Sequence, residues 1–264
     1  MRSLGGRNMT GFDIAAIVGA LAWIPPVVIF VRGRIVTPVV EVITPRTIEL
    51  GFSTFGPIIN LHVAFVTSRK DLVVSDIRIR LKHESGETRI FSWQGIVQHL
   101  GRISNPGSGQ LLSEKEQSVL AIKLNQRDVE ERFIRFQEEA YQIKKASIEE
   151  KALKQLLHLR AAQGFTPSAY HQSMEAKELC SYVKQAFPWK QGRFELTFEM
   201  KSRQRFRLVR DHFTFELNQI DIDMLEKNRD MVEPEYRNLI GQGTPGFTPE
   251  HVSWNWRYPS LGKT

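Results

Sequence analysis

The residues whose types and spacing could support chemistry form short, isolated patterns in this chain of 264 residues. Gly241, Gly243 and Gly246 match the G-x-G-x-x-G pattern of dinucleotide-binding proteins. That motif needs a strand before it and a helix that opens within it, whereas Pro245 and Pro249 interrupt this segment. We therefore expect a loop here and not a nucleotide-binding site.

Neither a metal site nor an activated nucleophile is indicated. Tetrahedral zinc needs three or four convergent ligands, and the single cysteine, Cys180, has no cysteine partner. Ser181 and Lys184 match S-x-x-K, but the S-D-N and K-T-G motifs that accompany it in β-lactamases are missing. The histidines are dispersed, without helical zinc-binding spacing: His62, His83, His99, His158, His171, His212 and His251. We expect no metal, no cofactor and no catalytic residue, although an enzyme of another class remains an alternative.

Asp221, Asp223 and Glu226 form a small acidic cluster shortly after Asn218. Such carboxylates could bind a hard cation or share acid–base work. They would also stabilise the first turn of a helix through its dipole, and asparagine is a favoured N-cap residue. We interpret the cluster as the capped start of a short helix.

Basic residues recur at alternate positions in two segments with a strand-like pattern, and alternate residues of a strand share one face. On neighbouring strands they would form a patch able to contact phospholipid headgroups or nucleic-acid phosphates. The alternative is a solvated sheet face that deters edge pairing. The candidate basic patch consists of Arg78, Arg80, Lys82, Arg203, Arg205 and Arg207.

Trp254, Trp256 and Tyr258 also alternate near the end of the chain. An exposed aromatic row could stack on sugar rings or lie at a membrane interface. A buried strand that completes the fold would show the same pattern. The sequence leaves both interpretations open.

The elements that must position these residues follow one uncharged apolar segment, which begins at Ile14 and ends at Val31. As a helix it would span about 27 Å, close to the hydrocarbon thickness of a bilayer. Pro25 and Pro26 lie within it and predict a kink. We expect a single transmembrane anchor; a cleaved signal peptide, a buried core helix and a re-entrant hairpin are the alternatives.

Lys and Arg residues flank the predicted anchor on both sides. Arg2 and Arg7 precede it, and Arg32, Arg34 and then Arg46 follow it. The positive-inside rule slightly favours a cytoplasmic location for the part of the chain after the anchor. The net charge of +7 is densest beside the anchor, which suits an anionic membrane surface better than a dedicated nucleic-acid domain.

Period-two patterns predict strands through residues 47–93 and again through residues 193–217. We expect a loop at residues 101–109, a strand at 118–124 and a strand at 202–209. Between the two β regions a helical pattern extends from about 138 to 190, with one helix starting at a Ser147–Glu150 capping box and another opening at Thr166 and Pro167.

The sequence therefore predicts a mainly β protein with an α insertion. Residues 1–34 would form an N-terminal tail and transmembrane helix, and residues 35–264 an immunoglobulin-like antiparallel β-sandwich with a helical insertion at about 138–190. We expect a membrane-anchored, non-enzymatic interaction module whose partners are the lipid bilayer and another protein. The alternatives are an anionic membrane-surface or nucleic-acid binder using the arginine-bearing strands, and an envelope glycan-binding domain.

Overall fold

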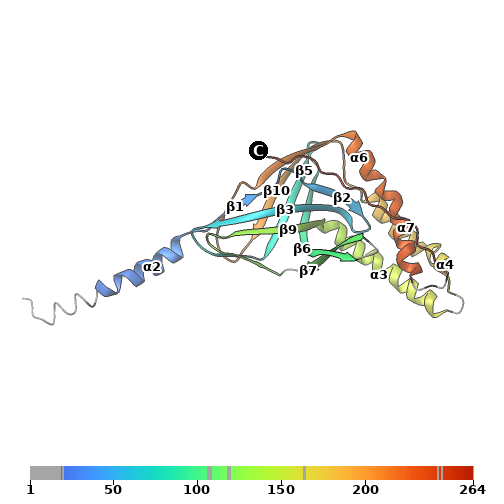
Figure 1. Cartoon of the computed structure of the whole chain (residues 1–264), viewed down its shortest axis with the longest axis horizontal. Coiled ribbons are helices and arrows are strands. Elements are labelled where there is room, and N and C mark those ends of the chain that lie inside the picture. The colour runs from blue at the N-terminus through green and yellow to red at the C-terminus, as the bar shows by residue number, and fades with distance from the viewer. Residues whose placement is uncertain are drawn as a thin grey trace, which may run out of the picture.

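The computed structural model describes residues 19, 21–105, 109–117, 120–162, 165–242, 244 and 246–263. Eleven strands form one curled sheet, and two further strands form a small separate sheet (Figure 1). The strands are β1 (Val39–Ile43), β2 (Glu49–Ser53), β3 (Gly56–Ser68), β4 (Leu72–Val74), β5 (Asp76–His83), β6 (Thr88–Asn105), β7 (Gly109–Gln117), β8 (Ile122–Leu124), β9 (Val129–Glu138), β10 (Gly192–Lys201), β11 (Arg207–Val209), β12 (His212–Leu217) and β13 (Gly262–Lys263).

The large sheet follows the order β11-β1-β3-β9-β6-β5-β10-β12-β13, with β2 on β3 and β7 on β6. Its neighbours run antiparallel except β1 and β11, which are parallel. The mainly β class is confirmed. The immunoglobulin-like sandwich is not confirmed, because these strands belong to one curled sheet instead of two facing sheets. Alternation predicts which face of a strand is buried but not which strands share a sheet.

The core lies on the inner side of this curl. In β10, Phe194, Leu196 and Phe198 are buried while Arg193 and Glu195 are exposed, as the period of two requires. Helices supply the rest of the same cluster, including Tyr141, Ile148, Ala152, Leu179, Val183, Ile222, Leu225 and Val232. Strands and helices therefore share one hydrophobic core.

Three helices lie between β9 and β10, and two follow β12. The helices are α2 (Ile24–Ile35), α3 (Glu139–Ala161), α4 (Pro167–His171), α5 (Met174–Gln185), α6 (Gln219–Glu226) and α7 (Asn228–Gly241). The predicted start at Thr166 and Pro167 is confirmed, since the Thr166 side chain caps α4. The predicted start at Ser147 is wrong, because buried residues recur at helical spacing from Tyr141 onward and α3 begins earlier.

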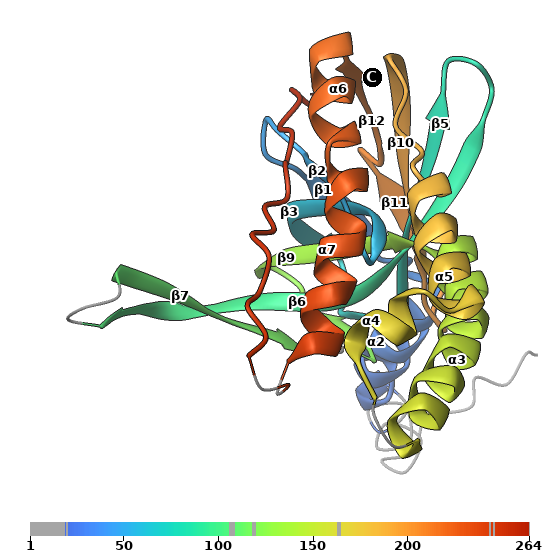
Figure 2. The ribbon, with the colours of Figure 1, turned by 90° about the vertical axis from the view of Figure 1, so that its right-hand side faces the viewer.

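One loop prediction and two strand predictions need correction. Residues 101–105 belong to β6 and Gly109 begins β7, so most of the expected loop forms a long hairpin that projects from the body (Figure 2). Of the strand expected over 202–209, only Arg207–Val209 is extended in a ladder. Of the strand expected over 118–124, residues 118 and 119 lie outside the described part, and among residues 120–124 only Ile122–Leu124 pairs, with β4.

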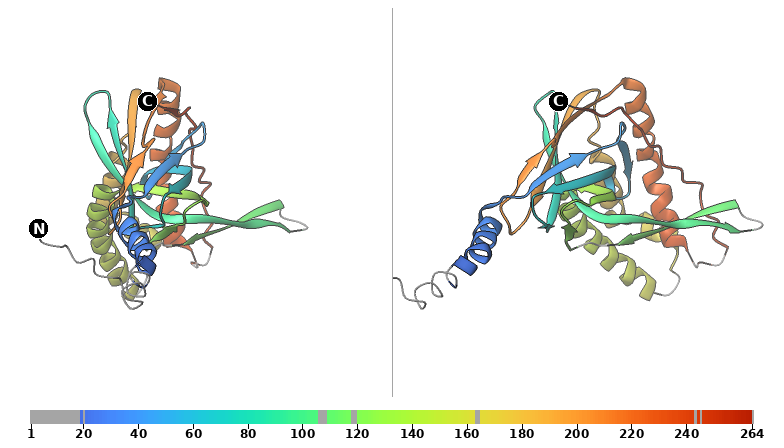
Figure 3. Two further views of the ribbon diagram at one scale, coloured as in Figure 1. Left: turned by 90° about the vertical axis from the view of Figure 1, so that its left-hand side faces the viewer. Right: turned by 60° about the vertical axis from the view of Figure 1, so that its left-hand side comes forward.

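Helix α2 projects from the end of the sheet where β1 begins (Figures 1 and 3). Every side chain from residue 21 to 28 is exposed, including Trp23, Val27 and Val28. Among the described residues, no helix combines the length and the apolar character needed to cross a bilayer. Residues 14–18 and 20 lie outside the described part, so the predicted anchor stays a prediction.

The C-terminal segment connects distant parts of the sheet. Leu50 and Arg257 exchange backbone hydrogen bonds of 2.8 and 2.9 Å, and the Leu261 amide donates to the Arg46 carbonyl at 2.7 Å. Further along, β13 pairs with β12. The segment thus bridges β12 to the strand region that includes β2.

Asn228, fully buried at the start of α7, holds this segment in place. Its Nδ2 donates to the Phe52 carbonyl at 2.9 Å and to the Asn255 carbonyl at 2.8 Å. Its Oδ1 accepts from the Asn255 amide at 2.7 Å. One side chain therefore satisfies backbone groups of β2 and of the C-terminal segment.

We expect Asn228→Ala to lower the free energy of unfolding by about 3 kcal/mol, because it leaves buried backbone groups unpaired. Asn238→Ala is the matched control: Asn238 bonds the Glu250 backbone through both amide atoms, but in an exposed position. Its loss should cost about 1 kcal/mol or less. Denaturant unfolding of both variants measures the difference, and equal losses would contradict the assignment.

Candidate functional site

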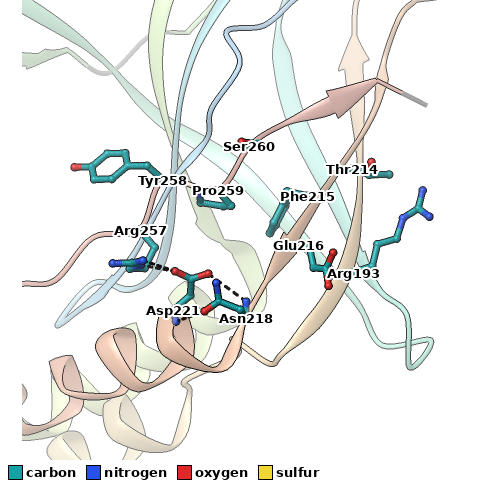
Figure 4. Close-up of a pocket in the computed structure, with 10 residues that line it drawn as sticks. All are labelled: Arg193, Thr214, Phe215, Glu216, Asn218, Asp221, Arg257, Tyr258, Pro259 and Ser260. Atoms are coloured by element: carbon teal, nitrogen blue, oxygen red, sulfur yellow. Dashed lines mark hydrogen bonds and ion pairs between the residues drawn. The ribbon is translucent and has the colours of Figure 1, made fainter.

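The main candidate site is an open cleft between β12, the C-terminal segment and the start of α6 (Figure 4). Its volume is about 760 Å³. Polar side chains predominate, and Phe215 and Pro259 add apolar surface. It is lined by Arg193, Thr214, Phe215, Glu216, Asn218, Asp221, Arg257, Tyr258, Pro259 and Ser260.

The acidic cluster predicted as a helix cap lies at one end of this cleft. The Asn218 side chain accepts from the Asp221 amide at 2.9 Å, and the Asp221 carboxylate accepts from the Asn218 amide at 3.2 Å. This capping box confirms the interpretation of Asp221 as a cap. Asp221 is also buried and accepts from Arg257 Nε at 2.6 Å, which joins the C-terminal segment to α6.

The other end of the cleft carries Arg193 and Glu216, which stand opposite each other in the β10–β12 ladder and are both exposed. Figure 4 shows them on the side away from Arg257. Sequence reasoning missed this site, because its residues come from three separate stretches of the chain: Arg193, residues 214–221 and residues 257–260. Only the strand register brings them together, and no local pattern encodes that register.

The first half of the candidate basic patch lies on β5 and is paired with acids. Arg80 Nε donates to Glu199 at 2.7 Å, and Arg78 Nε donates to Asp76 at 2.8 Å. Lys82 Nζ is 3.8 Å from Glu195. These acids largely neutralise the positive face of β5.

The second half lies elsewhere in the sheet. Arg203 and Arg205 occupy the connection before β11, and Arg207 begins that strand. All three are exposed. Since β6, β9, β3 and β1 separate β5 from β11 in the sheet order, the structure does not place the two halves on neighbouring strands.

The candidate aromatic face is only partly open. Trp254 and Trp256 are half-buried, and a Cβ added at Gly51 would overlap the Trp256 ring. Tyr258 is 60% exposed, and its hydroxyl donates to Glu49 at 3.0 Å. A sugar-binding row would therefore rest on Tyr258 alone.

A second cavity of about 230 Å³ lies between α4, α5 and α7 and includes His171 and Cys180. Burial raises the pKa of the Cys180 thiol to about 11 and lowers the pKa of His171. The neighbouring Lys184 is paired with Glu233 at 2.6 Å. A protonated thiol is a poor nucleophile, so this arrangement does not favour cysteine catalysis.

The remaining motifs gain no site from the structure. Within the described ranges, no three His, Cys, Asp or Glu side chains are grouped to hold a metal ion. Gly241 ends helix α7, so a helix and not a strand precedes the G-x-G-x-x-G pattern. Gly243 lies outside the described residues.

Comparisons with models of protein families, with curated proteins and with solved structures give no significant match. Any functional conclusion must therefore come from the chain itself.

The raised pKa of Cys180 gives a direct chemical test, since it is the single cysteine of the chain. At pH 8 the folded protein should react with iodoacetamide about 100-fold more slowly than the unfolded chain, because far less thiolate is present. The rate should rise with pH until it levels off near the pKa of about 11. Equal rates for folded and unfolded protein would show that the thiol is not buried as described.

Proposed function

We propose that the chain is a membrane-anchored, non-enzymatic interaction module. The observation that carries this proposal is the arrangement of three features along the body: an exposed apolar helix, exposed arginines beside it, and surface helices at the far end. Figure 1 shows α2 at one end of the body and α3 toward the other. Each feature suits a different partner, and their order suits a protein held at a bilayer by one end.

The apolar segment supports lipid as the partner of α2. A helix that docks in a protein groove needs one apolar face. Residues 21–28 instead expose apolar or small side chains around the whole helix, among them Leu21, Trp23, Ile24, Val27 and Val28. Only an apolar medium on every side would cover them, which favours an anchor that includes the residues from Ile14 to Val31.

Exposed arginines gather at the end of the sheet that joins α2. Strand β1 begins with Val39, which pairs with Arg207 on one side and Ser68 on the other. The turn after β3 and the connection before β9 lie at the same end, since the Arg127 amide contacts the Thr67 carbonyl. The exposed arginines there are Arg69, Arg127, Arg203, Arg205 and Arg207.

These arginines would meet the headgroups of a membrane that holds α2. Each cationic side chain near an anionic surface contributes about 1 kcal/mol. Together with Arg32 and Arg34 in the sequence, they favour the cytoplasmic side for the body through the positive-inside rule. The basic-patch hypothesis is therefore best supported as contact between these arginines and membrane headgroups.

The far end offers a surface for a protein partner. Helix α3 buries Tyr141, Ile148 and Ala152 against the body. Its outer side exposes Ile143, Leu153 and Leu157, to 69%, 54% and 57%. Together with Ala146 they recur at helical spacing on one side of α3, with the exposed ion pair of Glu150 and Lys154 among them. An apolar surface with one charged pair suits an amphipathic helix of another protein.

We expect the double variant Val27→Asp and Val28→Asp to leave membranes during a carbonate wash, since each aspartate in a span costs about 3 kcal/mol. Val73→Asp, at an exposed valine of the body, is the control and should stay membrane-bound. The released variant should still bind anionic vesicles at low salt through its arginines. Adding Arg203→Glu and Arg205→Glu to that variant should abolish vesicle binding. A double variant that remains in the membrane pellet would refute the anchor.

We expect Leu153→Glu with Leu157→Glu to weaken partner binding at least about tenfold while the protein stays folded and anchored. Lys151→Glu with His158→Glu changes exposed residues of the same helix outside its apolar surface and should have little effect. Quantitative pull-downs of the detergent-solubilised full chain compare the two. Identical partner sets for wild type and the leucine variant would exclude this surface.

A further inference from the structure

The ladder between β12 and the C-terminal segment stops after two pairs. Phe213 pairs with Lys263 and Thr214 with Gly262. The same antiparallel register would next align Phe215 with Leu261 and then Glu216 with Ser260. No backbone hydrogen bond joins Glu216 and Ser260 in the described part of the chain, and the cleft of Figure 4 opens between them.

Both sides of the cleft present backbone groups to it, because successive residues of an antiparallel strand point their groups alternately to the two neighbours. On one side, Arg257, Pro259 and Leu261 engage residues 46–50, so Tyr258 and Ser260 face the cleft. On the other side, the Asp211 carbonyl accepts from the Phe198 amide of β10, and alternation then directs the backbone of Glu216 toward the cleft.

The ladder is held open at its α6 end. Helix α6 begins directly after β12, and its Asp221 binds Arg257 of the C-terminal segment at 2.6 Å. The charges around the cleft are matched, since Arg193 also stands opposite Glu216. Unpaired backbone groups, and not an excess of charge, therefore distinguish this cleft.

We propose that the cleft binds a short extended peptide of a partner protein, which adds a strand between β12 and the C-terminal segment. Because the two borders are antiparallel to each other, the peptide runs parallel to one and antiparallel to the other. Its backbone bonds Glu216 on one side and Tyr258 and Ser260 on the other, and Phe215 contacts one of its side chains. Peptide addition to a strand edge is an established mode of recognition. The proposal does not depend on the membrane anchor.

The test uses the full chain in detergent, panned against a phage-displayed library of random heptapeptides. A recovered peptide is synthesised with and without N-methyl groups on alternate residues. Methylation of either alternate set should weaken binding about tenfold or more, because one set faces β12 and the other faces the C-terminal segment. The unmodified peptide should slow amide hydrogen exchange at Glu216 and Ser260. A library that yields no binder, or a binder insensitive to N-methylation, would overturn the proposal.

Two substitutions at one position separate backbone from side-chain recognition. Glu216→Pro removes the amide that faces the cleft, a position where a strand tolerates proline. Glu216→Ala removes only the side chain and keeps the amide. We expect about tenfold weaker peptide binding for the proline variant and little change for alanine, with thermal unfolding checked for both. Equal losses would mean that the side chain and not the backbone is recognised, which would overturn the proposal. If the proline variant does not fold, the N-methylated peptides test backbone recognition in its place.

Discussion

The structure depends on the backbone pairing of the C-terminal segment with β2 on one side and β12 on the other. A curled sheet whose borders stay open exposes rows of unpaired amides and carbonyls, which invite pairing with other chains. Arg257 pairs with Leu50, and β13 pairs with β12, so the last residues of the chain satisfy borders formed much earlier. Leu50 and Arg257 are about 200 residues apart in the sequence, and their contact closes a long loop. The entropy cost of closing such a loop grows only slowly with its length.

Buried side chains reinforce this pairing from the helical side. Asn228 bonds β2 and the C-terminal segment from α7, and Asp221 binds Arg257 from α6. Trp189, in the connection between α5 and β10, also holds β2, since its Nε1 donates to the Gly51 carbonyl at 3.0 Å. The helices therefore do more than cover the core, because they fix where the C-terminal segment crosses the sheet. These bonds connect elements that are distant in sequence.

Local patterns in the sequence predicted several strands and helix caps but not their assembly. The alternation of Phe194, Leu196 and Phe198 predicted β10, and Thr166 and Asn218 predicted two helix starts. The same alternation would serve a sandwich or a curled sheet, so the sandwich hypothesis went beyond its evidence. Glycines and a proline suggested a loop at 101–109, yet most of that stretch pairs as a two-stranded hairpin, since only its tip needs turn residues.

The candidate sites show the same limit from the functional side. The basic patch was inferred from two arginine-bearing segments, but a shared face requires neighbouring strands, and the sheet order separates β5 from β11. The two sets of basic residues differ in their surroundings. Arg80 on β5 is paired with an acid, whereas Arg203 and Arg205 are exposed near the start of β1, which follows α2. The cleft has no side-chain signature at all, because its specific feature is a ladder that stops after Thr214. A site made of backbone groups is invisible to residue types, and it becomes visible only when the register on both borders is known.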